Sequence, residues 1–198
     1  MNTKELILIN ALDMFAKSGY NSVSIRDMAR KVGIKESSIY YHFKNKQDIL
    51  DSLVAKYENH INGLIDKLQE SMSGLNMGEP FSWDWLSEFY FEQYLFEPFC
   101  NQMMRFMMIE QFHNDEMTKL YEHYLFDLPC RIQSESFMML VSYVIMDEKQ
   151  AEQSAKCFFS NITSLTFRYL LNGELTQIKK ETFREEVIDN INSMFKEG

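Results

Sequence analysis

Glycine, proline and cysteine are all scarce in this chain of 198 residues, which has 7 Gly, 3 Pro and 3 Cys. Because many short strands need many turns, this shortage argues against a β-sandwich or a barrel and predicts an all-α fold. The cysteines, Cys100, Cys130 and Cys157, are odd in number and isolated. They form neither a disulfide framework nor a paired metal-ligand spacing, so we expect a reducing, cytoplasmic location.

Long hydrophobic runs are also missing. The longest, Phe137 to Met146, is broken by Ser142 and is far shorter than a membrane span. The N-terminal apolar stretch is interrupted by Asn10 and Asp13 and has no small-residue cleavage site, so it is not a signal peptide. The chain shows no Gly-rich phosphate loop, nucleophile elbow or HExxH motif either. We therefore expect no membrane partner, no enzymatic activity and no cofactor.

Positive charge is in short supply overall, and a formal net charge of −9 would repel DNA if it were spread evenly. The distribution is uneven. Residues 1–50 hold eight Lys or Arg against five Asp or Glu, a balance of +3, whereas residues 51–198 hold twelve against twenty-four, a balance of −12. The two parts are therefore predicted to face different partners.

The basic N-terminal part has the pattern of three short helices. Residues 4–18 carry apolar side chains at helical spacing, which predicts an amphipathic helix. Ser24 has the position and chemistry of an N-cap for a second helix through about Lys31, and Gly33 permits a sharp turn into a third over residues 35–43. A helix, a glycine turn and a second helix in about twenty residues is the spacing of a helix-turn-helix.

A specific cluster, Tyr40-x-His42-Phe43-x-x-Lys46, ends this module. It accompanies further positions: Ile7-Leu8, Ala11-Leu12, Met14-Phe15, Gly19-Tyr20, Val23-Ser24-Ile25, Met28-Ala29, Gly33-Ile34 and Ile49-Leu50. With these residues, the stretch 4–50 closely resembles the DNA-binding domain of the tetracycline-repressor (TetR) family. The resemblance implies a three-helix DNA-binding domain, 1–46, and a larger helical ligand-binding and dimerisation domain, 47–198.

The resemblance also assigns roles to side chains. It implies that the phosphate contacts come from Ser24, Arg26, Tyr40, His42 and Lys46, and that the side chains nearest the base edges are Lys35, Glu36, Ser37 and Tyr41, with Ser38 exposed beside them. Lys35 removes an N-cap that most relatives have, and Glu36 opposes phosphate but can accept from a cytosine amino group. Phe43 is expected in the core.

Beyond the module, helical spacing predicts one long helix from Asn45 to about Met72, then a loop over 74–80. Further helices are predicted over residues 82–97, 99–112 and 115–146, with Pro129 kinking or dividing the last.

Aromatic and methionine side chains crowd the larger part of the chain. Fourteen of the twenty-eight aromatics lie between Phe81 and Phe126, and eight of the fourteen methionines between Met103 and Met146. This predicts a roomy apolar pocket for a small hydrophobic effector. Because residues 79–127 carry a balance of −8, the effector could be an organic cation. The candidate pocket residues are Phe89, Tyr94, Met103, Met107 and Tyr124.

Two C-terminal helices complete the chain. Asp147 and Gln150 resemble a capping box, and alternating spacings of four and three from Ala151 to Tyr169 form a heptad seam. A last amphipathic helix runs from Phe183 to about Lys196. Two such helices per subunit predict a homodimer through a four-helix bundle, with burial inside one subunit as the alternative.

The resulting hypothesis is a ligand-responsive transcriptional repressor that binds a near-palindromic operator as a homodimer and is released by its effector. An activator would have the same sequence features. A metal- or redox-sensing DNA-binding regulator also stays open, and its candidate metal ligands are His113, Asp115, Glu116, Glu122 and His123.

Overall fold

The structure is a computed structural model that describes residues 2–73, 89–142 and 147–195. These residues form helices and connecting turns, with no strand in the described ranges, so the all-α prediction is confirmed. The loop predicted over 74–80 and the first part of the helix predicted over 82–97, residues 82–88, lie outside them. The chain divides into two compact units, Met1–Thr118 and Lys119–Gly198. The DNA-binding boundary predicted after residue 46 concerns function and stays a prediction.

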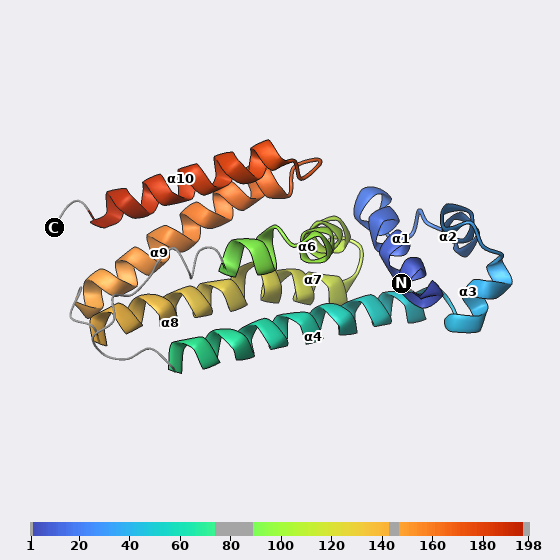
Figure 1. Cartoon of the computed structure of the whole chain (residues 1–198), viewed down its shortest axis with the longest axis horizontal. Coiled ribbons are helices and arrows are strands. Elements are labelled where there is room, and N and C mark those ends of the chain that lie inside the picture. The colour runs from blue at the N-terminus through green and yellow to red at the C-terminus, as the bar shows by residue number, and fades with distance from the viewer. Residues whose placement is uncertain (1, 74–88, 143–146, 196–198) are drawn as a thin grey trace. The chain divides into compact units, whose positions relative to one another are not determined.

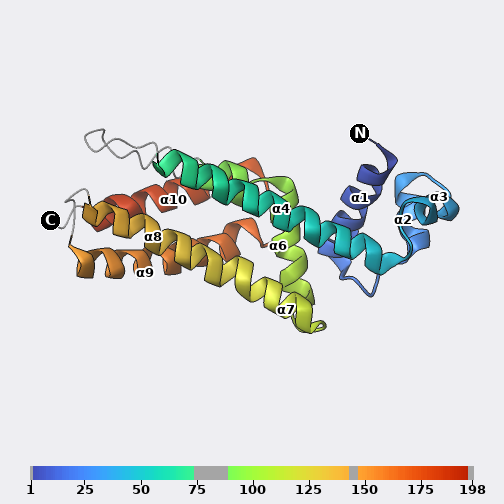
Figure 2. The same ribbon diagram turned by 90° about the horizontal axis from the view of Figure 1, so that it is seen from below.

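The N-terminal unit begins with three short helices and one long one. They are α1 (Thr3–Ser18), α2 (Ile25–Val32), α3 (Glu36–His42) and α4 (Lys46–Ser73). Each begins and ends within two residues of its predicted bounds. The first three share a small core that includes Ile7, Leu12, Phe15, Met28 and Ile39, all with no solvent exposure. Figure 2 shows α2 and α3 at the N-terminal end of α4, so the three-helix N-terminal domain with a helix-turn-helix is confirmed.

The same unit contains a π-helical turn, η1 (Phe91–Leu95), followed by α6 (Pro98–Glu110). Helix α6 packs against both α1 and α4. The ring of Phe106, which is fully buried, stacks on Phe15 of α1 with ring centroids 5.5 Å apart. Helix α6 therefore joins the three-helix module to the rest of its unit.

The C-terminal unit is a set of long helices. After α7 (Asp115–Glu122), which crosses the boundary between the units, come η2 (His123–Asp127), α8 (Leu128–Ser142), α9 (Glu148–Leu165), η3 (Thr166–Leu170) and α10 (Gln177–Phe195). Helix α9 packs against both α8 and α10 (Figure 1). The predicted capping box is confirmed, because the side chains of Asp147 and Gln150 each accept from the other residue's backbone N–H.

Pro129 divides the predicted helix over 115–146. The π-helical turn η2 comes directly before α8, in which Pro129 is the second residue. A proline has no N–H to donate, and its ring crowds the carbonyl four residues earlier. The widened turn over His123–Asp127 accommodates this crowding without ending the helical path.

Most of the heptad seam is buried inside its own subunit. Ala151, Ala155, Ile162 and Leu165 are all at most 7% exposed in the single chain. These four are buried in the packing of the C-terminal unit, whereas Phe158 and Tyr169, the other two residues of the seam, are half-buried. Burial of most of the seam within one subunit favours the alternative, and the dimer contact through the two C-terminal helices stays a prediction.

No helix in the described ranges combines the length and the apolar character needed to cross a membrane.

Candidate nucleic-acid interface

The turn between α2 and α3 is built on Gly33. Its backbone is left-handed, with φ 77° and ψ 31°, and its N–H donates to the carbonyl of Ala29 at 2.9 Å. Side chains larger than glycine rarely adopt this conformation. The turn directs Ile39 and Phe43 into the core, where they are 0% and 2% exposed. Phe43 is a core residue, as the sequence predicted.

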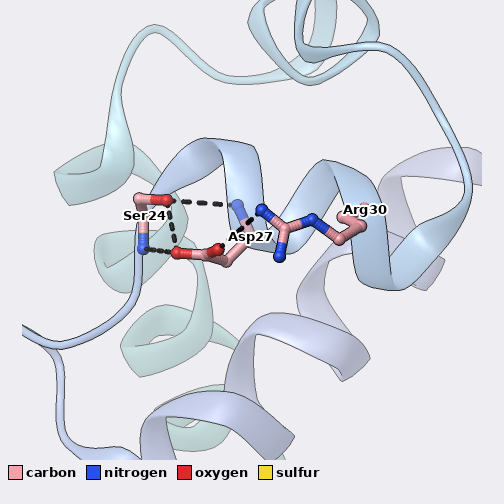
Figure 3. A network of polar contacts seen from close by, with 3 residues as sticks. All are labelled: Ser24, Asp27 and Arg30. Atoms are coloured by element: carbon pink, nitrogen blue, oxygen red, sulfur yellow. Dashed lines mark hydrogen bonds and ion pairs between the residues drawn. The ribbon is translucent and has the colours of Figure 1, made fainter.

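The start of α2 is fixed by a capping box (Figure 3). Ser24 Oγ accepts from the backbone N–H of Asp27, and the backbone N–H of Ser24 donates to Asp27 Oδ2, each at 3.1 Å. Arg30 forms an ion pair with the same carboxylate at 3.4 Å. Hydrogen bonds from Ser24 are the main cause that lowers the pKa of Asp27, with smaller electrostatic contributions from Arg30 and Arg26. The hydroxyl predicted to reach phosphate therefore already caps α2.

This capping box makes a measurable contribution to stability. Replacing Ser24 with alanine removes the side-chain acceptor for the Asp27 N–H. We expect the free energy of unfolding to fall by about 1 kcal/mol, measured by urea denaturation of the full chain. Ser22→Ala, in the exposed turn before α2, is the control and should change it by less than ~0.5 kcal/mol. Equal losses in the two variants would contradict the role of the cap.

Helix α3 presents polar and aromatic side chains outward. Lys35 is its N-cap residue and makes no side-chain capping bond, as the sequence predicted. Tyr41 is 85% exposed and Tyr40 is 54% exposed. The other predicted contact residues on α2 and α3 are also at the surface: Ser24, Arg26, Lys35, Glu36 and Ser37 are exposed, and Ser38 and His42 are half-buried. The predicted base-reading set therefore shares one short helix and its N-cap.

Lys46, predicted to contact phosphate, is engaged inside the unit. Its Nζ donates to the backbone carbonyls of Tyr20 and Val23, each at 3.0 Å, and lies 4.0 Å from the centre of the Tyr20 ring. Burial lowers the pKa of the Lys46 ammonium, and the carboxylate of Glu110 partly opposes that effect. Lys46 thus ties the start of α4 to the loop over residues 20–23 that precedes α2.

The same loop is held from the other side by Glu110, the last residue of α6. Its Oε1 accepts from the backbone N–H of Tyr20 at 2.7 Å, although the two residues are 90 positions apart. Glu110 is only 5% exposed. Gly19, next to Tyr20, has φ 78° and ψ 161°, and a Cβ built there would lie 2.9 Å from Glu110 Oε1. Glu110 is a candidate positioning residue that the sequence patterns did not identify.

The predicted effector residues are divided between the units. Tyr94, Met103 and Met107 lie in the N-terminal unit and are at most 8% exposed, with Phe89 half-buried just before η1. Tyr124, also buried, belongs to the C-terminal unit.

Aromatic rings gather between α4, η1 and the start of α6. The hydroxyl groups of Tyr57 and Tyr94 lie 3.4 Å apart. Tyr57 also meets Phe99 edge to face at 6.3 Å, and Tyr90 lies 5.5 Å from Tyr94. These four side chains form the aromatic cluster of the N-terminal unit.

The predicted metal ligands do not form a cluster in the structure. Among the described residues, one group of three potential ligands lies close together, and it does not include His113, Asp115, Glu116, Glu122 or His123. All five are exposed, because they lie on the outer side of α7 and its flanking turns. This part of the metal-sensor hypothesis is wrong. The three cysteines form no disulfide.

Comparisons with known proteins match the N-terminal part most strongly. Residues 7–53 match the family model for bacterial regulatory proteins of the tetR family. The chain is 35% identical over 89 residues to the negative transcriptional regulator IcaR of the icaADBC biofilm operon from Staphylococcus epidermidis. It is 33% identical over 89 residues to IcaR from Staphylococcus aureus strain Newman. These matches cover 45% of this chain and 44% of each relative.

Solved structures extend the likeness to the whole fold. A protein from Saccharomonospora viridis, solved in complex with choline, aligns with a TM-score of 0.66 at 20% identity, covering 96% of this chain and 95% of that one. A TetR-family transcriptional regulator from Marinobacter aquaeolei VT8 aligns with a TM-score of 0.63 at 19% identity, covering 98% and 99%. At this identity the likeness is one of fold. Residues 7–53 therefore match the N-terminal domain of the bacterial tetR-family regulators, and the chain shares its fold with solved proteins of that kind.

Proposed function

We propose that the chain is a repressor that binds a near-palindromic DNA operator as a homodimer, through α2, α3 and the start of α4. The observation that carries the proposal is α3, which exposes Lys35, Glu36, Ser37 and Tyr41 while Ile39 anchors it in the core. A short helix fixed in this way fits the major groove. Repression is favoured because the curated relatives are negative regulators.

The charge distribution supports this assignment of surfaces. The module over residues 1–46 would bind DNA, and the acidic remainder, 47–198, would bind the effector and the second subunit. Arg26, Tyr40 and His42 would contact phosphates on either side of the groove. The capping role of Ser24 leaves its hydroxyl as a weaker candidate. A DNA partner supports a cytoplasmic location for the protein.

The second subunit would cover the outer face of α9 and α10. The buried residues of the heptad seam face inward. The outer side of α9 has a shallow hollow of about 560 Å³, lined by Lys156, Cys157, Ser160, Asn161 and Ser164. On α10, Ile188 is 46% exposed although it is apolar. Small side chains permit close approach of helices, and an exposed isoleucine favours burial against a partner.

The aromatic cluster of Tyr57, Tyr90, Tyr94 and Phe99 supports an organic cation as effector. Aromatic faces attract cations, and quaternary ammonium groups are bound in this way in other proteins. The structural neighbour from Saccharomonospora viridis was solved with choline, which carries such a group. Effector binding would lower operator affinity only if the effector binds more tightly to the form that cannot bind the operator.

Salt dependence tests the DNA-binding proposal. We expect the full chain to bind duplex DNA with an affinity that falls ~10³–10⁵-fold between 50 and 200 mM salt, as for proteins with six to ten phosphate contacts. Fluorescence anisotropy with a labelled duplex measures the affinity. Binding that is absent, or that does not depend on salt, would contradict the proposal.

Lys46→Ala separates two roles for its ammonium group. If the group reaches phosphate, the variant loses affinity for all duplexes alike. The slope of log affinity against log salt concentration then falls in magnitude by about 1. We expect this result, with Lys67→Ala, on the exposed surface far along α4, as the unchanged control. A loss of affinity with an unaltered slope would show that Lys46 acts only through the carbonyls of Tyr20 and Val23.

A further inference from the structure

Three side chains with metal-binding donor atoms meet where α4 faces the start of α6. They are His60 of α4, Glu97, the N-cap residue of α6, and Cys100 in the first turn of α6. One ligand atom of each lies within 4.8 Å of the other two. Cys100 is fully buried, whereas His60 and Glu97 are half-buried. A cation could therefore reach the group from solvent.

The distances fit one tetrahedral ion after small side-chain movements. Bonds of ~2.0–2.3 Å to zinc at tetrahedral angles place the donor atoms about 3.3–3.8 Å apart. Because the donors lie within 4.8 Å of one another, they need to close by at most about 1–1.5 Å, which small rotations of the partly exposed His60 and Glu97 side chains can supply. A set of one nitrogen, one oxygen and one sulfur donor suits zinc and its neighbours rather than magnesium or calcium.

The surroundings already orient two of the three donors. His60 Nε2 lies 3.2 Å from the carbonyl of Gln93, and a neutral ring that donates there keeps its lone pair on Nδ1. A carbonyl partner of this kind is usual for histidines that bind metals. Glu97 Oε2 accepts from the Cys100 N–H at 2.7 Å, which holds the carboxylate beside the sulfur.

We propose that His60, Glu97 and Cys100 bind a divalent transition metal of the zinc class, and that binding changes the affinity of the protein for DNA. Binding exchanges the thiol proton of Cys100 for a metal–sulfur bond, and the proton passes to solvent. The fourth coordination position is left to water. The metal site does not depend on the proposed DNA-binding function, whereas the effect of the metal on DNA affinity does.

The two helices joined by the metal both hold the loop before α2. Helix α6 carries Glu97 and Cys100 at its start and Glu110 at its end, and Glu110 binds Tyr20. Helix α4 carries His60, and at its own start Lys46 binds the carbonyl of the same Tyr20. A metal that draws α4 and α6 together therefore acts on both contacts that position the loop.

Titration of the full chain with Co²⁺ tests the site directly. We expect a thiolate-to-cobalt charge-transfer absorption that saturates at one ion per chain and disappears when Zn²⁺ is added. His60→Gln should weaken binding by ~100-fold or more, since loss of even an outer partner of a metal ligand costs ~10–100-fold. Cys100→Ser should abolish the charge-transfer band.

Matched variants outside the group serve as controls. Cys157→Ser and His123→Gln replace exposed residues of the same two types and should leave the spectrum and the affinity unchanged. No charge-transfer band in the wild-type chain, or His60→Gln binding Co²⁺ as tightly as wild type, would overturn the site. Since His60 is partly exposed, its variant keeps the test valid even if Cys100→Ser fails to fold.

A second measurement separates the site from its effect on DNA. Zn²⁺ should change the affinity of the wild-type chain for duplex DNA by at least ~5-fold, and this response should be lost in His60→Gln. Binding of Co²⁺ with no response to Zn²⁺ in a chain that binds DNA would overturn the regulatory part alone. A chain that binds Co²⁺ but no duplex would contradict the proposed function and leave the metal site supported.

Discussion

Replacing Tyr41 with alanine should reduce affinity for the operator by ~5–150-fold, equivalent to a loss of 1–3 kcal/mol. The side chain is 85% exposed, and its ring contacts His42 edge to face at 5.0 Å. Little stability depends on so exposed a group, so the free energy of unfolding should change by less than ~0.5 kcal/mol. Sequence preference should relax at the base position that Tyr41 contacts. Anisotropy with the operator and with single-base variants of it measures both effects.

Phe112→Ala is the matched control for Tyr41. Phe112 is also an exposed aromatic residue of the N-terminal unit, at 83%, but it follows the end of α6 rather than lying on α3. Its loss should leave operator affinity unchanged. A Tyr41 variant that loses affinity equally for every sequence would indicate a phosphate contact. One that loses none would contradict the assignment of α3 as the recognition helix.

Gly19→Ala should destabilise the N-terminal unit by about 2–4 kcal/mol, more than alanine at Gly33 or Gly63 in the same unit. Two costs combine at Gly19. The backbone at φ 78° and ψ 161° is in a region that is essentially restricted to glycine. The added Cβ would also lie 2.9 Å from Glu110 Oε1, and that oxygen can move away only by weakening its bond to the Tyr20 N–H. Urea denaturation measures the loss.

Gly33→Ala provides the comparison. Its φ is also positive, at 77°, but no atom lies within 4 Å of an added Cβ. Only the left-handed backbone cost remains, about 1 kcal/mol. In a Glu110→Ala background, Gly19→Ala should cost about 1 kcal/mol less than in the wild-type chain, because the clash is absent. Equal costs at Gly19 and Gly33, or no change in that background, would contradict the contact with Glu110.

Local features of the fold followed from the sequence because they depend on neighbouring residues. The capping residues Ser24 and Asp147 and the turn at Gly33 were all predicted. So was the core position of Phe43, since helical spacing determines which face of a short helix is buried. The DNA-contact residues proposed on α3 rest on a family resemblance, and most of their side chains are exposed, as such a role requires.

Features that depend on residues far apart in the chain could not be predicted from the sequence. Glu110 binds Tyr20 across 90 positions, and nothing in the local sequence around either residue indicates a partner. The group of three potential metal ligands could not be predicted for the same reason, because His60 is on α4 while Glu97 and Cys100 are at the start of α6. The sequence predicted instead that polar residues close together around α7 bind a metal, but these side chains are exposed and form no cluster.

The heptad seam shows a different limit. A periodic apolar face indicates that a helix is buried on one side, but it does not indicate which helix covers that side. From Ala151 to Leu165 the covering helices are in the same subunit. The sequence therefore predicted a buried face on this helix without showing whether a helix of the same subunit or of a second subunit covers it.

Selection of bound sequences from a pool of random duplex DNA, with the full chain as bait, tests the central claim most directly. A homodimer that reads the major groove with one α3 from each subunit should enrich a twofold-symmetric sequence with two separated half-sites. Tyr41→Ala should lose preference within both half-sites while Phe112→Ala retains it. Enrichment of a sequence without twofold symmetry, or no enrichment at all, would contradict the account.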